Sequence, residues 1–81
     1  APAQEAEKIF SRIYRRAPQR TTNAKDNAAV TVMAYGLRPG VRNVSSERYA
    51  IKSFKATFGR SPVSSADWDA VRAIAYSGAT R

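Results

Sequence analysis

AEKIFSRIYRRAP at residues 6–18 recurs, with substitutions, as AIKSFKATFGRSP at residues 50–62. A second block, DNAAVTVMAYG at residues 26–36, matches DWDAVRAIAYS at residues 67–77. Between the blocks the first copy is longer by three residues, which fall in a Pro-containing turn. A repeat of this length is typical of one supersecondary unit that buries its apolar face against a copy of itself. Shared residues therefore indicate scaffold, and function is sought where the copies differ.

Each copy has the pattern of two helices joined by a turn. In the first copy Ile9, Phe10 and Ile13 recur at helical spacing and give one apolar face. Ala17-Pro18 ends this pattern, because the residue before a proline avoids the helical region. No segment alternates with period two for long enough to predict a strand.

The fold class predicted from these patterns is all-α. We expect helices over about residues 3–16, from Asn23 to Gly36, over about residues 46–58, and from Ser64 to Gly78. They form one small four-helix domain, 1–81, built from two tandem αα-hairpin repeats that share one core. The repeats span about 3–36 and 46–78, and the linker about 37–45.

Capping residues predict where three of the helices begin. Asn23 stands three residues before Asp26, and Ser64 stands three residues before Asp67. Each pair resembles a capping box with Asp in place of Glu, and the carboxylate lies where the helix dipole favours it. Ser45 is the expected cap of the third helix.

Trp68 is the only tryptophan, and the first copy has Asn27 in its place. Val63 is spaced to contact Trp68 as a hydrophobic staple, so we expect Trp68 in the core. The alternative is an exposed platform on which a base or sugar stacks. Tyr35 and Tyr76 end the even helices and are also expected to pack, with wet hydroxyl groups.

The composition argues against an enzyme. The 81 residues include neither cysteine nor histidine, which removes disulfides, thiolate zinc sites and the usual general base at neutral pH. The sequence also lacks a Walker loop, a dinucleotide-binding glycine pattern and a serine nucleophile elbow. We therefore expect no catalysis, no cofactor and no metal site.

Positive charge is the second strong feature. The chain has 14 Lys and Arg against 6 Asp and Glu, a net charge of +8. Ten of the cations are Arg, which suits bidentate contacts to phosphate or carboxylate. Cations repeat opposite the apolar face of each odd helix, with Tyr14 and Tyr49 near the edges. The predicted polyanion-binding residues are Lys8, Arg12, Arg15, Arg16, Arg48, Lys52 and Lys55 on these stripes, and Arg20 and Arg42 in loops. The alternative is an ordinary solvated face.

One cation recurs in both copies with a matched acid. Arg16 matches Arg60, and Asp26 matches Asp67. Recurrence favours a structural role, in which the Arg bonds turn carbonyls or pairs with the Asp. Arg20 lies just before a helix N-terminus, which can hold a phosphate, although the same residues suit ordinary capping.

The sequence predicts a non-catalytic binding module that engages a polyanion. Nucleic-acid backbone is the expected partner, with little sequence specificity, because phosphate contacts dominate such affinity and nothing here codes for base readout. The alternative is an extracellular or assembly module whose basic face binds an acidic protein, a wall polymer or a neighbouring subunit.

The compartment stays open at this point. A cytoplasmic location goes with nucleic-acid binding, and a secreted or cell-surface location goes with a signal peptide cleaved before Ala1. No apolar run approaches the roughly 20 residues that span a bilayer, so we do not expect an integral membrane protein.

Overall fold

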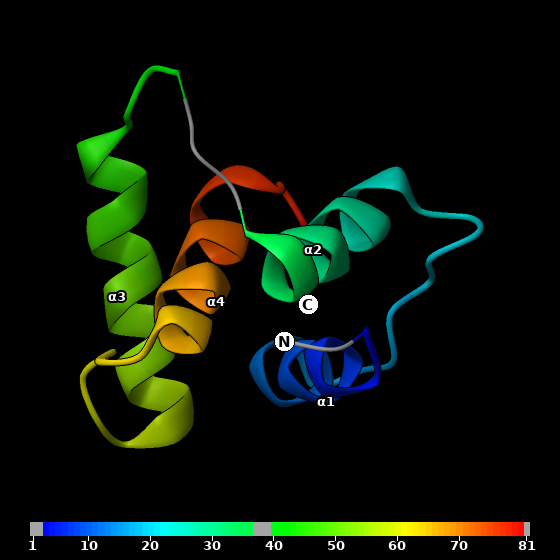
Figure 1. Cartoon of the computed structure of the whole chain (residues 1–81), viewed down its shortest axis with the longest axis horizontal. Coiled ribbons are helices and arrows are strands. Elements are labelled where there is room, and N and C mark those ends of the chain that lie inside the picture. Colours follow the sequence, from blue (N-terminus) through cyan, green and yellow to red (C-terminus); the bar gives the residue numbers. More distant parts are fainter. Residues whose placement is uncertain (1–2, 37–39, 81) are drawn as a thin grey trace.

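The computed structural model describes residues 3–36 and 40–80, and within them every regular element is an α-helix. Residues 37–39 of the predicted linker lie outside the described residues. The helices are arranged as two hairpins (Figure 1). They are α1 (Ala3–Tyr14), α2 (Ala24–Tyr35), α3 (Val44–Phe58) and α4 (Ser65–Tyr76). The predicted all-α, four-helix class is confirmed.

The two hairpins pack against each other through their second helices, α2 and α4. Within each hairpin α1 packs on α2 and α3 packs on α4, while α2 packs on α4 between the hairpins. The odd helices, α1 and α3, touch only lightly. The result measures 29 × 29 × 22 Å, with much of α1 and α3 left facing outward.

Two helices differ from their predicted bounds. α1 ends at Tyr14 rather than at residue 16, because Arg15 has a left-handed backbone with a φ of 58°. α3 begins at Val44 rather than at residue 46, because its N-cap is Asn43 and not Ser45. The Asn43 side chain accepts a backbone hydrogen bond at 3.0 Å.

The even helices begin where their capping residues predict. The Asn23 side chain accepts from the Asp26 N–H at 3.2 Å, and Ser64 Oγ accepts from the Asp67 N–H at 3.1 Å. The box at α4 is complete, because the Asp67 carboxylate also accepts from the Ser64 N–H at 3.2 Å. At α2 only half of the box forms, because the Asn23 N–H donates to the Gln19 carbonyl at 2.8 Å and not to the Asp26 carboxylate.

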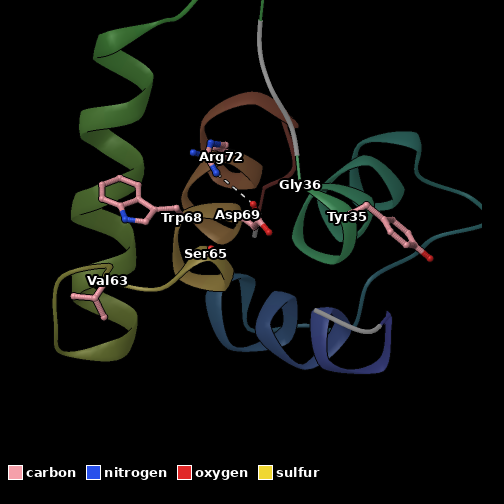
Figure 2. Close-up of a pocket in the computed structure, with 7 residues that line it drawn as sticks. All are labelled: Tyr35, Gly36, Val63, Ser65, Trp68, Asp69 and Arg72. Carbon is pink, nitrogen blue, oxygen red and sulfur yellow. Dashed lines mark hydrogen bonds and ion pairs between the residues drawn. The ribbon is translucent and has the colours of Figure 1, made fainter.

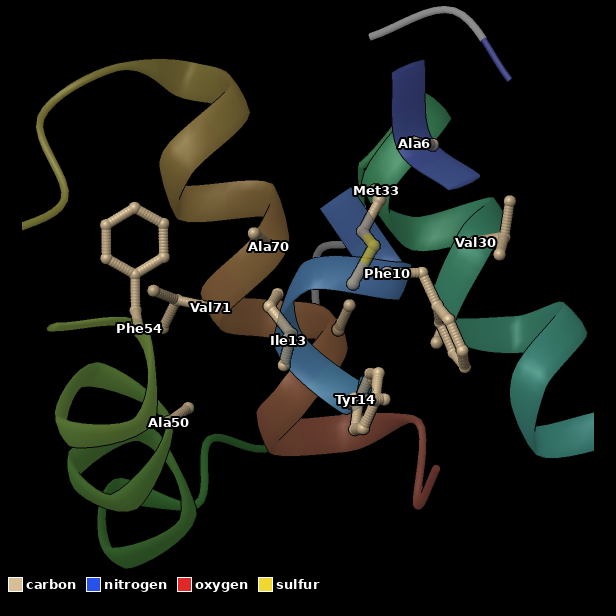
Figure 3. Packing of buried hydrophobic residues seen from close by; sticks show 12 residues of the cluster. Ala6, Phe10, Ile13, Tyr14, Val30, Met33, Ala50, Phe54, Ala70 and Val71 are labelled. Atoms are coloured by element: carbon tan, nitrogen blue, oxygen red, sulfur yellow. The ribbon is translucent and has the colours of Figure 1, made fainter. Parts of the chain in front are cut away.

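Buried apolar residues from all four helices form one cluster (Figure 3). Both copies contribute to it from matched positions, as Phe10 does with Phe54, at 0% and 1% exposure. The small alanines let the helix backbones approach closely. The cluster contains Ala6, Phe10, Ile13, Tyr14, Ala29, Val30, Met33, Ala50, Phe54, Ala70, Val71 and Ala73.

The recurring Arg and Asp make the same contact in both hairpins. Arg16 Nη1 and Nη2 donate to the two Asp26 oxygens at 2.5 and 2.7 Å. Arg60 Nη1 and Nη2 donate to the two Asp67 oxygens at 2.6 and 3.0 Å. Each Arg also donates to the carbonyl of the residue that follows it, at 3.3 and 3.4 Å. The predicted structural role of this pair is confirmed.

Further contacts around this pair are also matched. The N–H groups of Gln19 and Val63, at equivalent places in the two turns, donate to the Asp at 2.8 and 3.0 Å. The Arg guanidinium lies 5.1 Å from the Phe10 ring centroid in the first hairpin and 5.3 Å from that of Phe54 in the second. The two hairpins therefore hold equivalent clusters, and each cluster ties a turn to its own hairpin.

The α2–α4 contact is close at both ends. Gly36, with a φ of 86°, follows α2, and a Cβ there would lie 3.3 Å from Asp69 Oδ1 in α4. Gly78, with a φ of 79°, follows α4, and a Cβ there would lie 3.3 Å from Lys25 Cδ in α2. The two helices therefore run antiparallel, and each one ends beside the first half of the other.

Two aromatic residues expected to pack are instead exposed. Trp68 is 38% exposed, and its predicted staple partner Val63 is 79% exposed, so the core position predicted for Trp68 is wrong. Tyr35 is 81% exposed, which overturns its predicted packing as well. α4 packs on both α2 and α3, and the contact rotates another face inward. The buried residues of α4 are Asp67, Ala70, Val71 and Ala73.

Candidate functional site

All five N–H donors of Arg16 have partners inside the protein. Besides its bonds to Asp26 and to the Ala17 carbonyl, Nε and Nη2 donate to the Thr80 carbonyl at 3.1 and 2.6 Å. The hydrogen bonds to Asp26 raise the pKa of Arg16. The same bonds lower the pKa of Asp26, although burial of this carboxyl acts in the opposite direction. Arg16 therefore has no donor left for a phosphate.

Two more of the predicted cations are balanced by carboxylates. Arg20 Nη1 lies 3.2 Å from Glu7 Oε2. Arg42 Nη2 and Nε donate to the Glu47 oxygens at 2.5 and 3.2 Å. Hydrogen bonds from Arg42 and from the Tyr76 hydroxyl lower the pKa of Glu47 to about 2. The charges of Arg20 and Arg42 are therefore each compensated by a carboxylate.

The other six predicted cations are exposed and form no ion pair within residues 3–36 and 40–80. Arg12 places its guanidinium 4.4 Å from the Phe58 ring centroid, so the basic face of α1 meets the last turn of α3 there. All six lie on, or directly after, the two odd helices. They are Lys8, Arg12, Arg15, Arg48, Lys52 and Lys55.

Residues 77–80 fold back from α4 onto the first hairpin, and we name them the C-terminal strap. The bonds from Arg16 to the Thr80 carbonyl hold the strap's far end. The Ala79 N–H donates to Ser77 Oγ at 3.2 Å, and the Ala79 side chain packs against the core cluster. The strap thus covers the C-terminal end of α1.

A groove of about 770 Å³ opens between α1, α3, α4 and the strap, and we name it the strap groove. Its lining combines apolar side chains with polar side chains of α3. A neighbouring hollow of about 500 Å³ shares Tyr49 and Lys52 with it and adds Arg48 and Ile51. Exposed cations of α3 therefore follow one side of the groove. The groove is lined by Ile13, Tyr14, Tyr49, Lys52, Ser53, Ile74, Gly78, Ala79 and Thr80.

Two tyrosines line the strap groove in different ways. Tyr49 is 67% exposed, whereas Tyr14 is 5% exposed. Burial raises the pKa of Tyr14, and the nearby Ser77 side chain offsets part of that rise. The Tyr14 hydroxyl is itself buried and forms no hydrogen bond of normal geometry within the described residues. Tyr49 is therefore the aromatic side chain that a ligand can reach.

A separate depression of about 500 Å³ lies between the end of α2 and the start of α4 (Figure 2). Arg72 Nη1 and Asp69 Oδ1 pair across 3.3 Å, so the cation of this depression is balanced. Figure 2 shows the rings of Trp68 and Tyr35 directed to opposite sides, so they do not form one stacking platform. The lining residues are Tyr35, Gly36, Val63, Ser65, Trp68, Asp69 and Arg72.

The basic stripes were predictable, but the strap groove beside the stripe of α3 was not. Helical spacing indicates which cations face outward on each odd helix. It carries no information on Ser53, Ile74 or the strap, because their meeting depends on contacts between segments far apart in the chain. Only the position of Tyr49 beside the basic stripe of α3 could have pointed to this site.

Comparison with known proteins finds no family model, no curated protein and no solved structure that matches this chain. Among the described residues, no helix is both long and apolar enough to cross a membrane. That part of the chain also holds no group of three or more acidic side chains placed to bind a metal ion.

Proposed function

We propose that the protein is a non-catalytic module that binds a polyanion through α1 and α3. The proposed partner is nucleic-acid backbone, bound with little sequence specificity. The observation that carries this proposal is the division of the cations into two classes. Arg16, Arg20 and Arg42 are held by carboxylates. The six exposed cations lie on or directly after the odd helices and form no ion pair in the described part of the chain.

The exposed cations are retained at a cost to stability. Like charges four residues apart on a helix repel by a few tenths of a kcal/mol. Arg15 adds a second cost, because a left-handed backbone at a residue with a side chain costs about 1–2 kcal/mol. The second hairpin has Gly59 at the matched position, with a φ of 71°. An arginine kept where the repeat carries glycine supports a role in binding.

The proposal is tested by a salt titration of binding to duplex DNA. Each phosphate that the protein neutralises contributes about −0.9 to the slope of log affinity against log salt. Contacts from all six exposed cations would give a slope of about −5. Affinity that does not respond to salt would contradict the proposal.

A matched pair of variants separates contact from net charge. Arg15→Gln with Lys52→Gln removes two exposed cations and should make the slope shallower by about 2. Arg20→Gln with Arg42→Gln removes the same charge from paired cations and should change the slope much less. An equal loss in both variants would show that net charge alone attracts the polyanion. Thermal melts of both variants establish that they remain folded.

A second candidate function is an interaction module for a protein partner or a neighbouring subunit. One observation favours it: Tyr35, Val63 and Trp68 are exposed around the depression between α2 and α4. Binding through this face would be lost in Trp68→Ala and kept in Arg15→Gln with Lys52→Gln. Binding through α1 and α3 would show the reverse.

A further inference from the structure

The strap groove contains apolar and aromatic side chains that the binding of a phosphate does not require. A phosphate group needs only cations and N–H donors, and these stand on the open surface of α3. The groove is instead lined by the apolar side chains of Ile13, Ile74 and Ala79 together with the exposed ring of Tyr49. Such a site suits a ligand that is flat and apolar in one part and negatively charged in another.

Lys52 connects these two parts of the site. It lines the strap groove together with Tyr49, and it also lines the neighbouring hollow together with Arg48. A chain of anions that follows the outer face of α3 therefore passes directly beside the groove. One repeating ligand with a ring next to each negative charge is a strand of nucleotides.

We propose that the strap groove receives an unpaired nucleobase, so that the preferred polyanion is single-stranded rather than duplex nucleic acid. This inference rests on the proposed function and adds the class of partner. Tyr49 provides the surface on which the base stacks, and the apolar side chains of Ile13 and Ile74 line the same groove. Lys52 and Arg48 bind the phosphates on either side of that base.

The preference for a single strand has a physical reason. Stacking of bases on aromatic side chains tolerates any base, because every base has a flat face. In a duplex each base is already stacked and paired, and it must be flipped out before it can enter a groove. Duplex DNA can therefore contact the cations of α3 but leaves the groove empty.

The test compares three ligands of equal length that carry the same fluorescent label. They are an oligothymidine, an abasic strand with the same phosphates and no bases, and a blunt duplex. Oligothymidine should bind about tenfold more tightly than the abasic strand, which is the effect of one stacked base. The duplex should show no such gain over the abasic strand after correction for its number of phosphates.

Variants of two tyrosines localise the effect. Tyr49→Ala should bind oligothymidine and the abasic strand equally well, and Tyr49→Phe should keep the tenfold difference. Tyr35→Ala is the matched control, because Tyr35 is also largely exposed but lies on α2 outside the groove. Both positions are exposed, so thermal melts should show all three variants folded.

The outcomes distinguish this inference from the proposed function. Equal affinity of wild type for oligothymidine and the abasic strand would overturn the inference and leave phosphate binding intact. Equal losses in Tyr35→Ala and Tyr49→Ala would also overturn it. Failure of all three ligands to bind at low salt would overturn both. Polyglutamate that competes with oligothymidine in wild type but not in Tyr49→Ala would assign the groove to an acidic protein instead.

Discussion

The first hairpin carries Arg15 where the second carries Gly59, and both backbones are left-handed there, with φ values of 58° and 71°. Each residue follows directly after its odd helix, α1 or α3, and lets the chain turn toward the conserved contact of the repeat, the Arg–Asp pair. The turn is therefore required by the scaffold, whereas the side chain at that position is not. The first hairpin therefore carries an exposed cation at a position where a side chain strains the backbone.

The Arg–Asp pair itself is enclosed to different degrees in the two hairpins. The side chains of Arg16 and Asp26 are 29% and 0% exposed, against 51% and 11% for Arg60 and Asp67. The extra cover comes from the C-terminal strap, whose Thr80 carbonyl accepts two hydrogen bonds from Arg16. Equivalent contacts in the two hairpins therefore differ in their exposure to water, and so in strength.

The largest effect is expected for removal of the buried carboxylate. Asp26→Ala leaves Arg16 without its partner beneath the strap and should destabilise the protein by about 3 kcal/mol. Asp67→Ala, at the more exposed pair, should cost about 1–2 kcal/mol. Urea unfolding followed by circular dichroism measures both. An equal loss of unfolding free energy in the two variants would show that the strap does not strengthen the Arg16–Asp26 pair.

The pH dependence of stability provides a control for this comparison. Hydrogen bonds from Arg16 and Arg60 lower the pKa of Asp26 and the pKa of Asp67 below the ordinary value of 3.8. The unfolded chain then binds protons before the folded one does, so stability is full above about pH 5 and falls as the pH drops through the lowered values. Asp26→Ala should have a shallower acid limb than wild type. An acid limb that is the same in Asp26→Ala and wild type would contradict the lowered pKa of Asp26.

A smaller effect is expected at the position where the copies hold Trp68 and Asn27. Trp68 is 38% exposed, so Trp68→Ala should cost about 1–2 kcal/mol, less than the 3–5 kcal/mol expected of a fully buried aromatic. Asn27→Ala should stay within about 0.5 kcal/mol of wild type, as exposed positions usually do. Thermal melts compare the two variants. A Trp68→Ala variant that fails to fold would show that Trp68 contributes to stability as a core residue does.

Local rules predicted the parts of the fold that depend on neighbours in sequence. Ser64 and Asp67 form the predicted capping box, and the spacing of apolar residues placed the four helices. The matched Arg and Asp were also predictable, because their recurrence in both copies indicated a shared contact. These features depend on helical geometry and on the repeat, and both can be read without a tertiary structure.

The remaining features depend on how the helices pack. Trp68 satisfies the spacing of a staple, yet α4 packs against two helices and turns this side chain to the edge. Ser45 and Asn43 are both good caps, and only the structure shows that Asn43 is used. The strap groove combines α1, α3, α4 and the strap, which no local pattern connects. Its cations were predictable and its shape was not.

A small effect on stability is expected at the left-handed position. Arg15→Gly removes the steric strain of a side chain at a φ of 58° and should stabilise the protein by about 1 kcal/mol. Gly59→Ala introduces the same strain in the second hairpin and should destabilise it by about 1 kcal/mol. A Cβ at Gly59 would meet no atom within 4 Å, so the cost there comes from the backbone alone. Thermal melts of the two variants should shift in opposite directions.

The same substitution tests why an arginine stands at this position. If Arg15 contacts phosphates, Arg15→Gly should bind nucleic acid more weakly although it melts at a higher temperature. Arg15→Lys keeps the charge and the strain, so it should retain most of the affinity and melt like wild type. Greater stability and weaker binding in one variant cannot result from unfolding, which lowers both. An Arg15→Gly variant with unchanged affinity would show that Arg15 does not contact the nucleic acid. A lower melting temperature of this variant would show that the backbone at Arg15 is not strained.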